Sequence, residues 1–207
     1  MRIDLVITGL EPGGAERCLT TLAIGLHRRG HEVRVWSLLN KPTGPKRWCV
    51  NRLDDVGVQV ETLGVASWLD LPKAYARLHR SWVDREPDVV QSFLHHANVL
   101  AAVSCPAMSP TAWVAGIRVA QPRPLRSGIE RMALRRATKV VCVSQSVEQF
   151  ARKKLGVRSQ QSVVIENSVD VKRFANAVAD PAMAQRDDGG VSTHWVVMAG
   201  RLGEQKN

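Results

Sequence analysis

The stretch that decides the fold is Ile3-Asp4-Leu5-Val6-Ile7-Thr8-Gly9-Leu10-Glu11-Pro12-Gly13-Gly14. Its first half, residues 3–8, is an apolar run of strand length. The glycine pair turns the chain into a helix expected over 15–29, which presents one apolar face and stops at Gly30. A buried strand that leads directly into an amphipathic helix is typical of a parallel sheet.

The same alternation continues along the chain. Further strands are expected at 33–36, 58–61, 89–91, 112–115, 139–143 and 162–165, and further helices at 69–84, 97–103, 124–136 and 145–155. The pattern predicts an α/β fold of the doubly wound, Rossmann-like kind: a mainly parallel sheet with helices on both faces. In such a sheet ligands bind at the carboxyl ends of the strands.

The composition changes after Phe174. Residues 1–176 are therefore expected to form one domain, and the Ala-, Asp- and Gly-rich residues 177–192 a linker. Residues 193–199 then begin a new strand, so 193–207 are expected to be the start of a truncated second domain.

The net charge of +10 comes from 29 Lys and Arg against 19 Asp and Glu. The excess is local, because residues 118–158 carry 11 basic and 2 acidic side chains. This argues against a uniformly basic coat for nucleic acid. Without a signal peptide or a spanning apolar run, the chain is expected to be cytoplasmic, touching the inner membrane face at most.

The Gly13-Gly14 turn lets backbone N–H groups approach an anion, or it is simply a tight turn. It is not the dinucleotide fingerprint, since no GxGxxG is present, which argues against a nucleotide-binding sugar epimerase. Metal ligands are not expected either, because clustered carboxylates are absent from the sequence and the four cysteines lie far apart. His27 and His31 have HxxxH spacing, but they flank the expected helix stop at Gly30 and are expected to be surface or capping residues.

Five motifs in order resemble the retaining glycosyltransferases of family four, which have the GT-B fold. They are Gly13-Gly14-Ala15-Glu16-Arg17, the stretch 87–98 that ends in His96-Ala97-Asn98, Val143-Ser144-Gln145-Ser146, the stretch 164–170 followed by Phe174, and Gly200-Arg201-Leu202-Gly203-Glu204-Gln205-Lys206-Asn207.

The resemblance implies an enzyme that moves a sugar from a nucleoside-diphosphate sugar to an acceptor hydroxyl with retention. The donor is a co-substrate, and no cofactor or metal is expected. Gly13 and Gly14 would border the donor diphosphate, and Arg201 and Lys206 would clamp it. The acidic motif that the family carries late in its second domain is not in these residues, so the 207-residue chain by itself is expected to be inactive.

On the acceptor side, the resemblance implies that His96 hydrogen-bonds an acceptor hydroxyl as the catalytic residue; the alternative is a structural histidine that caps its helix. Asn98 and Ser144 are expected to bind the acceptor, and His95 to pack or lie on the surface. Many relatives have a histidine just after the fifth strand, where this chain has Arg118. Arg118 could hold an anionic acceptor or a phosphate, and the proton-handling role of that histidine has no evident occupant.

In the basic segment, Leu125, Ile129, Met132 and Ala133 are expected to form an apolar stripe against the sheet, with Arg131 and Arg135 on its flank. The charges are either dipole partners and solubilising groups, or a face for an anionic membrane surface or a glycan or lipid-linked acceptor. No nucleic-acid partner is expected. The alternative to the enzyme is a non-enzymatic α/β module that binds a sugar phosphate or an anionic lipid head group.

Overall fold

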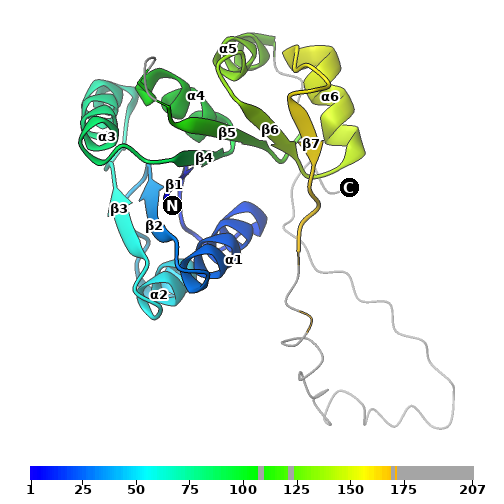
Figure 1. Ribbon diagram of the computed structural model, residues 1–207. Coiled ribbons are helices and arrows are strands. Elements are labelled where there is room, and N and C mark those ends of the chain that lie inside the picture. The colour runs from blue at the N-terminus through cyan, green and yellow to red at the C-terminus, as the bar shows by residue number, and fades with distance from the viewer. Residues whose placement is uncertain (107–109, 121–123, 169–170, 172–207) are drawn as a thin grey trace, which may run out of the picture. The chain divides into compact units, whose positions relative to one another are not determined.

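The fold is a single seven-stranded sheet in a computed structural model that describes residues 1–106, 110–120, 124–168 and 171. Residues 1–168 form one compact unit. The strands are β1 (Arg2–Ile7), β2 (Glu32–Ser37), β3 (Gln59–Thr62), β4 (Val89–Phe93), β5 (Ala112–Ile117), β6 (Lys139–Cys142) and β7 (Ser162–Val164). Their order is β3-β2-β1-β4-β5-β6-β7, and every neighbouring pair is parallel (Figure 1).

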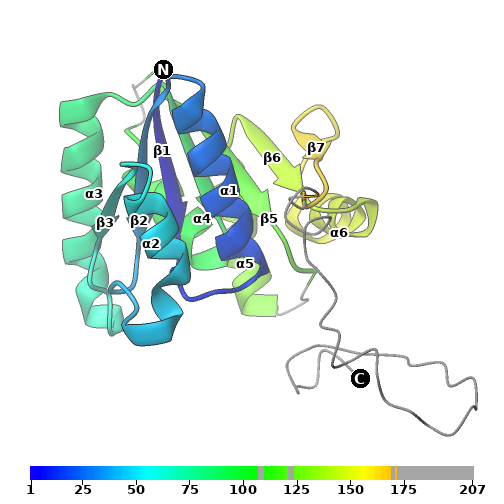
Figure 2. The same ribbon diagram turned by 90° about the horizontal axis from the view of Figure 1, so that it is seen from below.

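Helices cover both faces of this sheet. They are α1 (Gly14–Arg28), α2 (Trp48–Asp54), α3 (Leu71–Arg85), α4 (His95–Ser104), α5 (Pro124–Leu134) and α6 (Gln145–Leu155), with the 3-10 turns η1 (Gly44–Arg47) and η2 (Trp68–Asp70). Figures 1 and 2 show α1 and α2 on one face and α3 to α6 on the other. The predicted doubly wound, Rossmann-like class is therefore confirmed.

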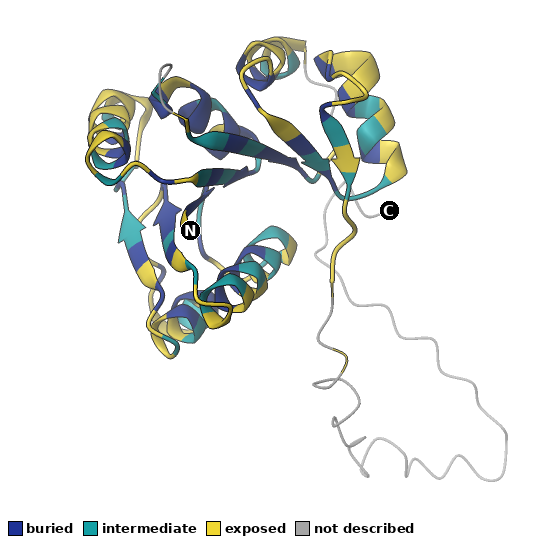
Figure 3. Cartoon of the chain, in the orientation of Figure 1, coloured by how far each residue is buried: buried dark blue, intermediate teal, exposed yellow. Residues whose placement is uncertain are grey.

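Strand β1 explains how one apolar run serves both faces. Successive side chains of a strand point to opposite sides. Ile3, Leu5 and Ile7 pack with α1 and α2, whereas Val6 packs with the core under α3 and α4. From residue 3 onward β1 is buried on both sides, as the dark blue central strands in Figure 3 illustrate.

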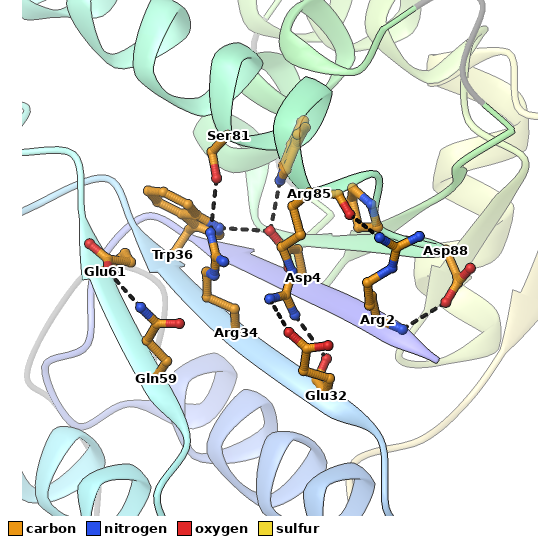
Figure 4. Close-up of polar contacts among 12 residues, drawn as sticks. Arg2, Asp4, Glu32, Arg34, Trp36, Gln59, Glu61, Ser81, Arg85 and Asp88 are labelled. Atoms are coloured by element: carbon orange, nitrogen blue, oxygen red, sulfur yellow. Dashed lines mark hydrogen bonds and ion pairs between the residues drawn. The ribbon is translucent and has the colours of Figure 1, made fainter.

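Asp4 is the exception in this apolar strand, because it is a fully buried carboxylate. Its Oδ2 accepts hydrogen bonds from the indoles of Trp36 and Trp82, both at 2.9 Å, and its Oδ1 lies 3.1 Å from Nε of Arg85. Arg85 also pairs with Glu32, so the charge of Asp4 is anchored across β1, β2 and α3 (Figure 4). Burial nevertheless dominates and raises the pKa of Asp4 above its ordinary value.

Two elements differ from the expectations. Helix α2 lies between the second and third strands, where no helix was expected; it is only seven residues long and buries Cys49, Val50 and Leu53. Helix α4 begins at His95 rather than at 97. The predicted boundary at 176, the linker 177–192 and the strand at 193–199 lie outside the described residues.

Helix α5 is rotated relative to the prediction. Leu125, Ile129 and Met132 are exposed, and the helix buries Glu130, Ala133 and Leu134 instead. The predicted apolar stripe against the sheet was therefore wrong except at Ala133. Helical spacing identifies residues that share a face, but Glu130 has buried partners that turn another face inward.

Among the described helices, none is long and apolar enough to cross a bilayer.

Candidate active site

All predicted site residues that the structure describes follow the carboxyl ends of strands. Because every strand is parallel to its neighbours, these ends meet at one edge of the sheet. The chain builds outward from β1 to β2 and β3, then returns to place β4 on the other side of β1. This reversal between β1 and β4 is the topological switch point at which open α/β sheets bind ligands.

The glycine turn stands at the start of α1. Gly13 is the residue before the helix and Gly14 its first residue, and because Gly13 has no side chain it caps none of the backbone N–H groups at the helix start. A Cβ at Gly14 would meet no heavy atom within 4 Å, whereas one at Gly13 would collide with the carboxylate of Glu16. The helix start therefore has open space in front of Gly14, as an anion site needs, with an acidic side chain beside it.

A groove lies at the carboxyl ends of β1 and β2. Its lining includes residues 9–11, which come just before the glycine turn in the sequence. It has a volume of about 770 Å³ and is lined by Gly9, Leu10, Glu11, Leu39, Asn40, Lys41, Pro42, Thr43, Gly44, Pro45, Lys46 and Val65. Glu11 and Lys46 form an exposed ion pair at 3.1 Å across it. No motif in the sequence pointed to this groove, because its lining comes from loops.

His95 and His96 occupy different environments although they are neighbours. His95 is buried, and its Nδ1 lies 3.1 Å from Oε2 of Glu130 on α5. His96 is exposed, with its ring edge-on to that of His95 at 5.2 Å. Partial desolvation lowers the pKa of His96, and the nearby charges of His95 and Arg126 lower it further. An exposed imidazole that is neutral at pH 7 can accept a proton or a hydrogen bond, as the catalytic prediction for His96 requires.

The turn into α4 is strained. Leu94 has φ 72°, a left-handed conformation that a branched side chain adopts at a cost of about 1–3 kcal/mol. Asn98 N–H donates to its carbonyl oxygen at 2.9 Å. Strained backbone of this kind clusters at functional sites, and here it sets both histidines at the edge of the sheet.

Asn98 is fully buried and forms the centre of a polar network. Its amide donates to the carbonyl oxygen of Gly116 at 3.1 Å and to Oε1 of Glu130 at 3.2 Å. Its Oδ1 accepts from Ser92 Oγ at 2.7 Å, and Trp113 Nε1 donates to Ser92 Oγ at 2.9 Å. Asn98 thus has no exposed surface for the acceptor contact that was predicted; in this structure it ties α4 to β4, β5 and α5.

Arg118 follows β5 and is half-buried. Its guanidinium lies 5.0 Å above the ring of Phe93, and it donates to Asn167 Oδ1 and, at 3.0 Å, to Cys18 Sγ. The Nε of Arg118 is buried without a hydrogen-bond partner among the described residues. That unused donor suits the predicted role of Arg118 in holding an anion.

A small pocket of about 30 Å³ brings several of these groups together between α4 and α5. Its lining consists of Leu94, His95, Gly116, Ile117, Arg118, Val119, Arg126, Glu130 and Phe150. Of the predicted acceptor-side residues it includes Arg118 and not His96, Asn98 or Ser144. His95, predicted to pack or lie on the surface, is therefore a pocket residue, held by a carboxylate that no sequence motif marked.

Ser144 caps α6. Its Oγ accepts a hydrogen bond from the backbone N–H of Val147 at 3.3 Å and lies 2.9 Å from Ser146 Oγ. These contacts satisfy the helix start, and an acceptor role for Ser144 stays a prediction.

Arg201 and Lys206, the predicted donor clamp, lie outside the described residues. Within the described ranges, no cluster of three or more His, Cys, Asp or Glu could hold a metal ion.

A parallel sheet with its ligand edge at the β1–β4 switch point and a glycine turn before α1 defines the class: a Rossmann-like α/β domain. Residues 12–173 match the family model described as Glycosyltransferase Family 4. The chain therefore belongs to this family. No curated protein sequence matches it.

Solved structures agree on the fold. The chain is similar to Alr3699/HepE from Anabaena, a structure in complex with UDP and glucose, with a TM-score of 0.67 and 20% identity over 83% of this chain and 46% of that one. A glycosyltransferase from Rickettsia africae gives a TM-score of 0.68 and 16% identity over 88% and 47%. The fold also resembles UDP-GlcNAc 2-epimerase from Neisseria meningitidis (TM-score 0.54, 14% identity over 81% and 47%). The chain spans about half the length of these proteins.

Proposed function

We propose that this chain is the acceptor-side half of a retaining glycosyltransferase that moves a sugar from a nucleoside-diphosphate sugar to an acceptor hydroxyl. The observation that carries the proposal is the family match over residues 12–173 together with the open helix start at Gly14. Backbone N–H groups at a helix amino end bind phosphate, and a Cβ-free residue allows close approach. Arg201 and Lys206 would complete the donor clamp from the second domain.

The acceptor would enter at the pocket between α4 and α5. Arg118 offers an unused buried donor there, and Arg126 adds a second guanidinium. Two guanidinium groups favour an acceptor that carries a phosphate or carboxylate. Such a group is present in a lipid-linked acceptor, so we further propose an anionic membrane surface as a partner of residues 118–158.

The experiment assays sugar transfer by the protein extended through its second domain, with UDP-glucose as the first donor because HepE was solved with UDP and glucose. Gly14→Ala should lower kcat/KM by about ten-fold or more, since the methyl would displace the diphosphate. Gly25→Ala is the matched control: it lies on the same helix, is exposed, and its added Cβ also meets nothing within 4 Å.

The 207-residue chain alone should transfer no sugar. Robust transfer by this chain alone would contradict the need for a second domain. An extended protein that binds UDP-sugars but never releases UDP would overturn the transferase proposal in favour of a binding module. Equal effects of Gly14→Ala and Gly25→Ala would remove the glycine turn from the donor site.

A further inference from the structure

Helix α5 presents an apolar stripe to solvent. Leu125, Ile129 and Met132 are 80%, 44% and 71% exposed. At 3.6 residues per turn, these three positions fall within about 60° of the helix circumference, so their side chains form one continuous strip. Single exposed apolar residues need no explanation, but an aligned set on one helix marks a contact surface.

Basic side chains border this strip. Arg131 and Arg135 are exposed on one side of it, and Arg126 lies half-buried on the other. The last turn of the adjacent α6 adds Arg152, Lys153 and Lys154, all exposed. The two helices are neighbours, since the guanidinium of Arg131 lies against Gly156 at the end of α6.

Both acidic side chains of residues 118–158 turn away from this surface. Glu130 is buried against His95 and Asn98. Glu148 is half-buried and accepts a hydrogen bond from Ser162 Oγ at 2.6 Å. The described part of the segment therefore shows solvent most of its cations and its apolar strip, while its two carboxylates serve internal contacts.

We propose that α5 inserts into the interface of an anionic bilayer, with Leu125, Ile129 and Met132 below the head groups and the flanking arginines at the lipid phosphates. This inference rests on the anionic membrane partner in the proposed function. It goes further, because it adds the insertion of an apolar helix face to electrostatic attraction. A helix with an apolar strip and basic flanks binds membranes through both contributions. Guanidinium groups match phosphate geometry with paired hydrogen bonds.

Two observations favour a bilayer over a second copy of the chain. Pairing two α5 strips face to face would bring the basic flanks of one copy against the basic flanks of the other, and like charges repel. An anionic bilayer instead neutralises them. The strip also starts at the site edge, since Leu125 adjoins Arg126, which lines the pocket with Arg118. An inserted α5 would hold that pocket at the depth of lipid phosphates.

The test measures co-sedimentation of the 207-residue chain with vesicles of phosphatidylcholine and phosphatidylglycerol at a seven-to-three ratio. Leu125→Ser/Met132→Ser should raise the lipid concentration for half-maximal binding by about ten-fold. Val83→Ser is the matched control, because Val83 is an exposed apolar residue, at 50%, on α3. It should bind as the unchanged chain does. Circular dichroism and thermal melting should be the same for all variants, because the changed side chains are exposed.

High salt separates the two contributions. Inserted α5 should keep part of its binding at about 0.5 M salt, where charge attraction is screened within a few ångströms. Binding by the unchanged chain that Leu125→Ser/Met132→Ser does not weaken would overturn insertion and leave the charge-based membrane partner in place. Absence of binding to the anionic vesicles would overturn both, without bearing on sugar transfer.

Discussion

His95 of α4 and Glu130 of α5 meet inside the protein, with 3.1 Å between Nδ1 and Oε2. The other carboxylate oxygen of Glu130 accepts from Asn98 at 3.2 Å. One buried carboxylate thus fixes the rotation of α5 and orients a histidine of the pocket between α4 and α5. This contact explains why the apolar strip of α5 faces outward.

Replacing Glu130 should cost stability. Glu130→Gln removes the charge and leaves the partners in place, so we expect a loss of about 1–3 kcal/mol in the free energy of unfolding. Urea denaturation followed by circular dichroism measures it. Glu166→Gln, at an exposed position, is the control and should change stability by less than about 0.5 kcal/mol. A Glu130→Gln chain as stable as this control would contradict the role of the buried carboxylate.

His96 should titrate below its ordinary pKa of 6.5, because its ring is partly desolvated and lies near His95 and Arg126. NMR titration of labelled histidines measures this, with the His96→Gln chain giving the assignment. Arg126→Gln should raise the pKa of His96, since it removes a positive charge. Arg80→Gln, at an exposed position on α3, should leave it unchanged. A pKa at or above 6.5 in the unchanged chain would be the contrary result.

Asp4 should make stability fall with rising pH. Burial raises its pKa in the folded chain above the unfolded value of 3.8. Its favourable contribution is therefore complete below about pH 3.8 and is lost as the pH rises through the folded pKa. The unfolding free energy of the unchanged chain minus that of Asp4→Asn should decrease from pH 4 to pH 7. Asp84→Asn, at an exposed position, supplies the baseline; a difference that grows with pH would reverse the sign argued here.

Cys18 should be the first of the four cysteines to react with a thiol reagent. The structure places it half-buried beside Arg118. The other three are buried, and burial raises their thiol pKa, to about 11 at Cys142. Iodoacetamide at pH 8 followed by mass spectrometry should give one early adduct. Cys18→Ser should abolish it, and an early adduct on Cys142 would contradict this order.

The order of strands and helices could be predicted from the sequence because burial on both faces demands unbroken apolar runs such as 3–8 and helices of amphipathic period. The glycine turn could be predicted for a similar reason: a helix start that must stay open needs residues without a Cβ. Helix α2 was missed because seven residues span only two turns, too few for a period to be recognised.

The sequence by itself determined the family, the sheet and the places where site loops emerge, since these follow from local patterns and ordered motifs. Tertiary structure alone decided which face of α5 turns inward, which histidine lies in the pocket, and that Asn98 is a buried tie. Each of these depends on a contact between residues distant in the chain, such as His95 with Glu130, and such a contact leaves no periodic trace in the sequence. A buried carboxylate must find its partners, and that requirement overrides the apolar spacing of its own helix.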